Sequence, residues 1–215
     1  HVCTQIKCWE ADGLPARPVA VNLSAVPFKQ QNLDTRIATV LADHGVAEEH
    51  ITLEITETAS MQNTEKSLQV MQRLRDKGIG LSIADFGAGY SNLNYLRCFP
   101  VNSIKIDRCF ISRMTENPQD LAIIKAIIVM GHSLGMSIVA EGVETEAQLC
   151  LLAVCQCDEM QGFYFSEPVP APQYAQLLMS DKSIGPEKLG RRHSERALLI
   201  VDDEKYILSA LRRSL

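Results

Sequence analysis

Six short apolar runs, separated by helical patterns and polar stretches, restrict the folds open to this chain more than any other feature of its sequence. The runs cover residues 18–24, 51–56, 79–86, 103–107, 136–141 and 160–166. Several are continuous in Val, Ile and Leu, which is typical of parallel strands covered on both faces. Strands that alternate with helices predict an α/β fold.

Helix boundaries between these runs carry their own signals. Asn63 can cap a helix that stops just before Gly78. Pro118 is placed to open a second helix, because proline fits the first helical turn. Thr145, followed three residues later by Gln148, forms a capping-box pattern ahead of a third helix. The chain therefore consists of repeated βα units.

Polar side chains recur at or near the C-terminal ends of the predicted strands, and they favour one architecture over another. These residues are Asn22, Glu54, Asp85, Lys105, Asp107 and Glu141. A spacing of roughly 20 to 35 residues between strands suits either a (β/α)₈ barrel or an open doubly wound sheet. A barrel collects the strand ends into one ring, whereas an open sheet spreads them along an edge. We therefore expect a barrel.

Only part of that barrel is expected in the sequence. A (β/α)₈ barrel has eight strands and about 250 residues, so six visible strands predict that about 60 residues, including the first strand, precede His1. The last residue, Leu215, falls inside an unfinished helical pattern. Both ends are therefore interpreted as cuts in a longer protein.

Composition excludes several classes of function. A net charge of -5 argues against a protein that wraps a nucleic-acid polymer, since that requires clustered Lys and Arg. The longest apolar run, residues 122–130, is interrupted by Lys125 and is too short to span a bilayer. The seven cysteines include no CxxC pair, so we interpret them as incidental thiols of a cytoplasmic protein and not as zinc ligands.

The composition and hydrophobic pattern of the chain change after residue 179. Residues 180–196 are polar, contain Gly and Pro and lack periodicity, so they are expected to be a linker. Residues 197–215 begin a new unit with a buried-type strand, an acidic pair and the start of a helix. Nineteen residues cannot fold alone, so this unit is expected to be the beginning of a second domain.

Six motifs give residues 1–179 a resemblance to a known family. They are VNLS (21–24), LEITE (53–57), ADFGAGYSNLNYL (84–96), IKIDR (104–108), VAEGVET (139–145) and QGFYFSEP (161–168). In this order and spacing they resemble EAL-domain cyclic di-GMP phosphodiesterases. The resemblance implies an incomplete modified (β/α)₈ (TIM-type) barrel that hydrolyses cyclic di-GMP to pGpG with two Mg²⁺ or Mn²⁺ ions.

The resemblance also assigns metal ligands. Asn22 and Glu54 would bind the first ion, Asp85 would bind the second, and Glu141 would belong to the metal and water shell. Hard divalent cations prefer such oxygen ligands. Two ions about 4 Å apart would activate water and neutralise the phosphoryl oxygens.

Four further residues, together with Glu141, receive roles from the same resemblance. Lys105 and Glu141 would act in catalysis, with Lys105 holding the attacking water or the phosphate. Glu57 would orient the loop after Asp85, and Gln161 and Asp107 would contact the substrate. Taken singly, Lys105 has an alternative explanation as a surface charge, Asn22 as a turn cap and Asp107 as a partner of Arg108.

Two departures from the family pattern bear on activity. The name-giving Glu-x-Leu motif belongs to the missing first strand, so this chain alone is expected to be inactive. Ala84 stands where the family has the first of two adjacent aspartates, the one that bridges both ions. An alternative function therefore stays open: a catalytically degenerate EAL domain that serves as a cyclic di-GMP receptor or as a protein-interaction module.

The C-terminal unit has a second, shorter resemblance. Asp202 and Asp203 follow a predicted strand, as the Mg²⁺-binding acidic pair does in flavodoxin-like response-regulator receiver domains. The resemblance implies two-component regulation through a sensor kinase. A homodimer is a separate expectation, and the sequence leaves the oligomeric state open. A strand that ends in two aspartates also occurs in other α/β folds.

Overall fold

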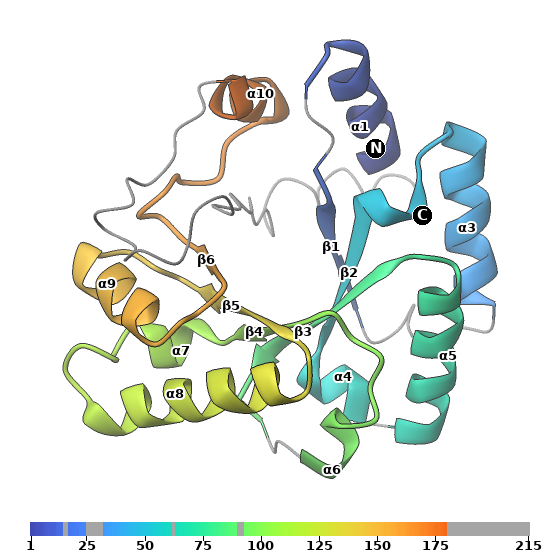
Figure 1. The fold of residues 1–215 in the computed structure, drawn as a ribbon. Helices are drawn as coiled ribbons and strands as arrows, with labels where there is room; N and C mark the ends of the chain where they lie inside the picture. Colours follow the sequence, from blue (N-terminus) through green and yellow to red (C-terminus); the bar gives the residue numbers. More distant parts are fainter. Residues whose placement is uncertain (15–16, 25–31, 62, 90–92, 180–215) are drawn as a thin grey trace.

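A single parallel sheet of six strands forms the centre of the computed structural model, which describes residues 1–14, 17–24, 32–61, 63–89 and 93–179. The strands are β1 (Val19–Leu23), β2 (Ile51–Thr56), β3 (Gly80–Phe86), β4 (Ser103–Ile106), β5 (Ser137–Glu141) and β6 (Glu159–Gln161). Each strand pairs in parallel with the next one along the chain. The described residues therefore form the predicted α/β architecture, a parallel half-barrel (Figure 1).

Most of the helices connect successive strands and pack on the outside of the curved sheet, whereas the first precedes β1 and the last follows β6 (Figure 1). They are α1 (Val2–Ala11), α3 (Leu33–His44), α4 (Glu57–Met61), α5 (Thr64–Asp76), α6 (Leu93–Leu96), α7 (Arg108–Ile111), α8 (Pro118–Ser133), α9 (Glu146–Val154) and α10 (Ala171–Met179), with a 3₁₀ turn at Glu48–His50. The three predicted starts are confirmed. Asn63 caps α5, Pro118 occupies the first turn of α8, and Thr145 forms a capping box with Gln148 at α9.

The hydrophobic core lies between the sheet and these helices. Alternate strand residues such as Ile55, Leu81 and Ile104 point outward and are completely buried. Met71 of α5 and Ile124 of α8 cover them from the helical layer and are equally buried. This packing fixes the register of the sheet, because a shift by one residue would turn the apolar side chains away from the helices.

The other face of the sheet is lined by small and polar side chains. It borders a cavity of about 700 Å³, whose strand residues are Val19, Ala20, Thr52, Glu54, Gly80, Ser82, Ser103, Lys105, Ser137, Val139 and Glu159. The interior of a (β/α)₈ barrel is usually filled by bulky branched residues. The expectation that the strands are apolar on both faces is therefore wrong for the inner face.

The last strand is shorter than predicted. β6 ends at Gln161, whereas the apolar pattern predicted a strand over residues 160–166. Gly162 passes so close to the neighbouring loop that an added Cβ would lie 2.2 Å from the carbonyl oxygen of Val143. The chain then turns, and the N–H of Phe165 donates to the carbonyl of Gly162 at 3.1 Å. The aromatic residues that suggested a strand belong to this turn.

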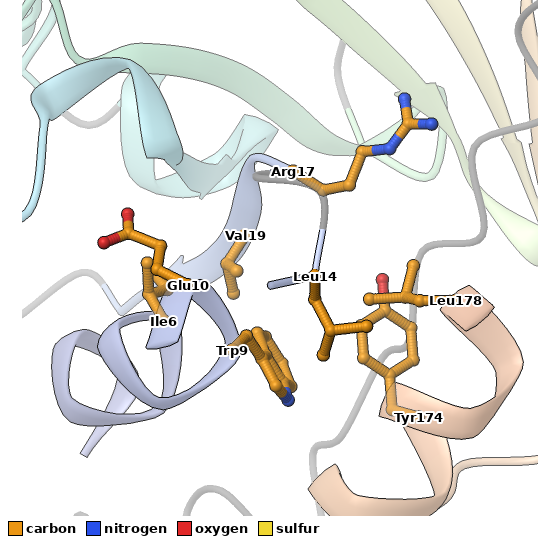
Figure 2. Close-up of a pocket in the computed structure, with 8 residues that line it drawn as sticks. All are labelled: Ile6, Trp9, Glu10, Leu14, Arg17, Val19, Tyr174 and Leu178. Atoms are coloured by element: carbon orange, nitrogen blue, oxygen red, sulfur yellow. The ribbon is translucent and has the colours of Figure 1, made fainter. Parts of the chain in front are cut away.

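The first and last helices of the described chain contact each other. Trp9 of α1 and Tyr174 of α10 have ring centroids 5.2 Å apart. Figure 2 shows this contact beside a small slot, which Leu14 and Leu178 also line. In the described residues β1 and β6 are the edge strands of the sheet, so this contact joins the helices next to both edges.

Two sequence expectations concern other parts of the chain. No helix in the described ranges has the length and hydropathy that crossing a bilayer requires. The predicted linker, the receiver-like unit and its acidic pair, Asp202 and Asp203, lie outside the described residues.

Cys157 supplies a test of the packing. Its side chain is fully buried, and Sγ lies 3.2 Å from the carbonyl oxygen of Glu159. Burial raises the pKa of the Cys157 thiol to about 12 from an ordinary value of 9.0. The folded chain therefore keeps this proton at a higher pH than the unfolded chain, and the resulting stabilisation is complete below about pH 9 and lost as the pH rises towards 12.

We expect the free energy of unfolding to fall across that pH range more steeply for the wild type than for Cys157→Ala. The difference in slope should be at most about 1.4 kcal/mol per pH unit. Urea unfolding at a series of pH values measures both proteins. Parallel curves would show that Cys157 is not buried in this way.

Candidate functional site

The register of the sheet brings predicted site residues together at its C-terminal edge. Asn22 of β1 lies opposite Glu54 of β2, and Glu141 of β5 lies opposite Gln161 of β6. Lys105 belongs to β4, between these two pairs. Glu54, Lys105 and Gln161 are buried, whereas Asn22 is exposed.

Lys105 is the centre of the site. Its Nζ lies 2.7 Å from Oε1 of Glu54 and 2.5 Å from Oε1 of Glu141, and its side chain is only 2% exposed. Burial alone would lower the pKa of Lys105, but the carboxylates of Glu54 and Glu141 outweigh burial and raise it above its ordinary value. The ammonium group therefore stays charged and joins carboxylates from β2 and β5.

A bulge in β3 places Ala84 and Asp85 at the same edge. The register between β3 and β4 shifts between Ile83 and Phe86, and Asp85 has a φ of 55°. An extra residue in one strand redirects side chains, and such bulges are common beside active sites. Ala84 is 5% exposed and lies opposite Thr56, whereas Asp85 is exposed. Of Ala84 and Asp85, the buried residue is therefore the alanine, which offers no ligand atom.

Glu57 connects β2 to the loop after β3. It is 2% exposed, and its Oε2 accepts a hydrogen bond of 3.0 Å from the N–H of Gly87. Gly87 is two residues beyond Asp85, so Glu57 constrains the backbone close to that carboxylate. Within the described part of the chain, the buried Oε1 of Glu57 accepts no hydrogen bond.

Asp107 has a structural contact. Its Oδ1 accepts a hydrogen bond of 2.7 Å from the N–H of Cys109 and so caps the N-terminus of α7. This helix starts immediately after β4, which places its first turn beside the strand that carries Lys105. The structure thus gives Asp107 a capping contact, and the expected substrate contact remains a prediction.

Two glycines shape the site, and the sequence did not predict their role. Glu141 and Gln161 are each followed by glycine. A Cβ on Gly142 would lie 2.8 Å from Cβ of Arg108, just as one on Gly162 would meet Val143. The signal available in the sequence was the position of each glycine directly after a polar strand-end residue.

The chemistry of the donor set suits a divalent cation. Among the described residues, no three His, Cys, Asp or Glu side chains form a ready metal cluster. The amide oxygen of Asn22 and the carboxylates of Glu54, Asp85 and Glu141 are nevertheless the hard ligands that Mg²⁺ and Mn²⁺ prefer. Gln161 is 6% exposed, and its buried Oε1 accepts no hydrogen bond from the described residues. A buried oxygen without a donor fits a site that takes a cation or its water.

Comparisons with known proteins identify the family of this chain. The family profile described as EAL domain matches residues 1–168. MucR of Pseudomonas aeruginosa, a bifunctional diguanylate cyclase/cyclic di-GMP phosphodiesterase, is 41% identical over 173 residues, which cover 80% of this chain and 25% of MucR. The cyclic di-GMP phosphodiesterase NbdA of the same organism is 38% identical over 178 residues, covering 83% of this chain and 23% of NbdA. The chain spans about a quarter of the length of these relatives.

Solved structures extend the similarity to three dimensions. The MucR phosphodiesterase in complex with cyclic di-GMP has a TM-score of 0.77 at 41% identity, over 80% of this chain and 70% of that chain. Klebsiella pneumoniae BlrP1 in complex with manganese and cyclic di-GMP has a TM-score of 0.69 at 28% identity, over 77% and 42% of the two chains. The matched family profile, the identity to these relatives and the shared fold together show that this chain belongs to the EAL domain family.

Proposed function

We propose that this chain carries the catalytic site of a metal-dependent phosphodiesterase that hydrolyses cyclic di-GMP to pGpG. The observation that carries the proposal is the buried Lys105, held between Glu54 and Glu141 at the C-terminal edge of the sheet. Structures of MucR and BlrP1 hold cyclic di-GMP, and those of BlrP1 also hold manganese or calcium. Cyclic di-GMP and a divalent cation are therefore the first ligands to test for binding to this protein.

The ligand set proposed for two divalent ions is Asn22, Glu54, Asp85 and Glu141. Bound there, divalent cations would lower the pKa of a coordinated water and neutralise charge on the phosphoryl oxygens. Magnesium and manganese both suit these oxygen ligands.

The side chains of the protein have separate tasks in this proposal. Lys105 supplies a positive charge that is fixed before substrate arrives, because two carboxylates already orient it. Such preorganised charge stabilises a developing anion without reorganisation. Glu57 holds the loop at Gly87, which limits the movement of the neighbouring Asp85. Gln161 would orient substrate or water through its buried amide.

One observation favours a second function. Ala84 is buried where the family pattern has a carboxylate, so one negative charge is missing from the edge of the sheet. Cations that lie close together repel, and the repulsion is offset less when a bridging carboxylate is absent. The alternative is a receptor that binds cyclic di-GMP without hydrolysing it.

For either function, we propose control by a receiver domain that starts at residue 197.

Turnover by the full-length protein tests the proposed function. We expect production of pGpG from cyclic di-GMP with Mg²⁺ or Mn²⁺, and loss of this activity when the metal is removed by EDTA. Glu54→Gln should abolish turnover, since it removes the negative charge that would bind a cation and that pairs with Lys105. Chromatography of the nucleotide products measures each reaction. Binding of cyclic di-GMP by the wild type without any pGpG would establish the receptor instead.

Restoring the missing carboxylate separates the two functions further. We expect Ala84→Asp to tighten Mn²⁺ binding and to raise turnover at limiting metal, because a carboxylate there would offset the charge of the cations. Ala84→Asn is the matched control, since it adds a side chain of the same size without the charge. Calorimetric Mn²⁺ titration and initial rates measure both variants. Equal behaviour of Ala84→Asp, Ala84→Asn and the wild type would show that this position has no part in metal binding.

A further inference from the structure

The loop that follows Glu141 is tied to the neighbouring βα unit by a single buried side chain. Gln148, in the first turn of α9, is 5% exposed. Its Oε1 accepts hydrogen bonds from the N–H groups of Glu144 at 2.8 Å and Thr145 at 3.0 Å. Its Nε2 donates to the carbonyl of Ile111, the last residue of α7, at 3.1 Å.

The last of these bonds goes beyond helix capping. A capping box requires only that the glutamine side chain return to the N-cap backbone. The bond to Ile111 leaves the helix and reaches the unit that begins with β4, 37 residues away in sequence. Each polar atom of the Gln148 amide is therefore used, in a place where an unsatisfied group would be costly.

These contacts join the two segments that follow the strands of the ion pair. β4 carries Lys105 and leads into α7, while β5 ends at Glu141 and leads into the loop that Gln148 holds. Close packing of Gly142 on Arg108 brings the same two segments together immediately after Glu141. The Lys105 to Glu141 contact is thus flanked by a second bridge between the same pair of βα units.

We propose that Gln148 is a positioning residue, which holds the Glu141 carboxylate against Lys105 by joining the loop after β5 to α7. The inference rests on the proposed function, because it concerns the same site. Partners of this kind, which orient a ligand without touching the metal, commonly affect metal affinity or activity by about 10- to 100-fold. A role limited to capping α9 would affect the stability of the fold and leave the site unchanged.

Three variants of the full-length protein separate these roles. Gln148→Met keeps the length of the side chain and removes all three hydrogen bonds. Gln148→Glu keeps the acceptor for Glu144 and Thr145 and loses the donor to Ile111. Thr145→Ala removes the hydroxyl that caps the N–H of Gln148 and leaves the Gln148 amide in place. Thr145→Ala is therefore the control for a loss of capping alone.

Mn²⁺ titration without substrate and steady-state kinetics give two independent readouts. We expect Gln148→Met to weaken Mn²⁺ binding and to lower kcat by about 10-fold or more, with little change in KM. Gln148→Glu should also be impaired, whereas Thr145→Ala should bind Mn²⁺ and turn over like the wild type after correction for any unfolded fraction.

The outcomes distinguish this inference from the proposed function. Equal effects of Gln148→Met and Thr145→Ala on Mn²⁺ binding, or no effect of either, would overturn the positioning role. A wild type that makes no pGpG, combined with weaker Mn²⁺ binding by Gln148→Met alone, would overturn the phosphodiesterase and support the positioning role. Failure of the wild type to bind Mn²⁺ would overturn both.

Discussion

The buried contact of Lys105 with Glu54 and Glu141 is the constraint on which the rest of the site depends. Lys105 and Glu54 are buried, and Glu141 is 15% exposed. Burying charged groups is expensive unless they are paired, and removing one member of a buried ion pair typically costs about 3–5 kcal/mol. The three residues come from β4, β2 and β5, so the charges can be satisfied only when the sheet is wound and curved as observed. The site and the half-barrel therefore stabilise each other.

The inner face of β3 makes this contact sterically feasible. β3 lies between β2 and β4, so the Lys105 side chain must cross it to reach Glu54. By strand alternation β3 presents Gly80, Ser82 and Ala84 on that face, all of them small. A bulky residue would occupy the space that the lysine uses. The small side chains on the inner face of β3 thus leave room for the ion pair between Lys105 and Glu54.

The sequence predicted the elements that have strong local signals. It did not predict features that depend on contacts between residues distant in the chain. Strand order follows from the repeated βα units, and the starts of three helices follow from caps such as Asn63 and Pro118. The residues after Gln161 look strand-like but form a turn, because Gly162 packs on Val143. No local pattern reveals that Gln148 bonds to Ile111, since the two residues are 37 positions apart. The pairing of Lys105 with two acids likewise required the curvature of the sheet.

The location of the metal site is the central claim, and an anomalous diffraction experiment tests it most directly. Crystals of the full-length protein grown with Mn²⁺ and cyclic di-GMP should show anomalous peaks within coordination distance of Glu54 and Glu141 oxygens. The phosphate groups of the ligand should lie at the same edge of the sheet, close to Lys105. Manganese bound elsewhere, or a ligand that does not approach these three residues, would contradict the account.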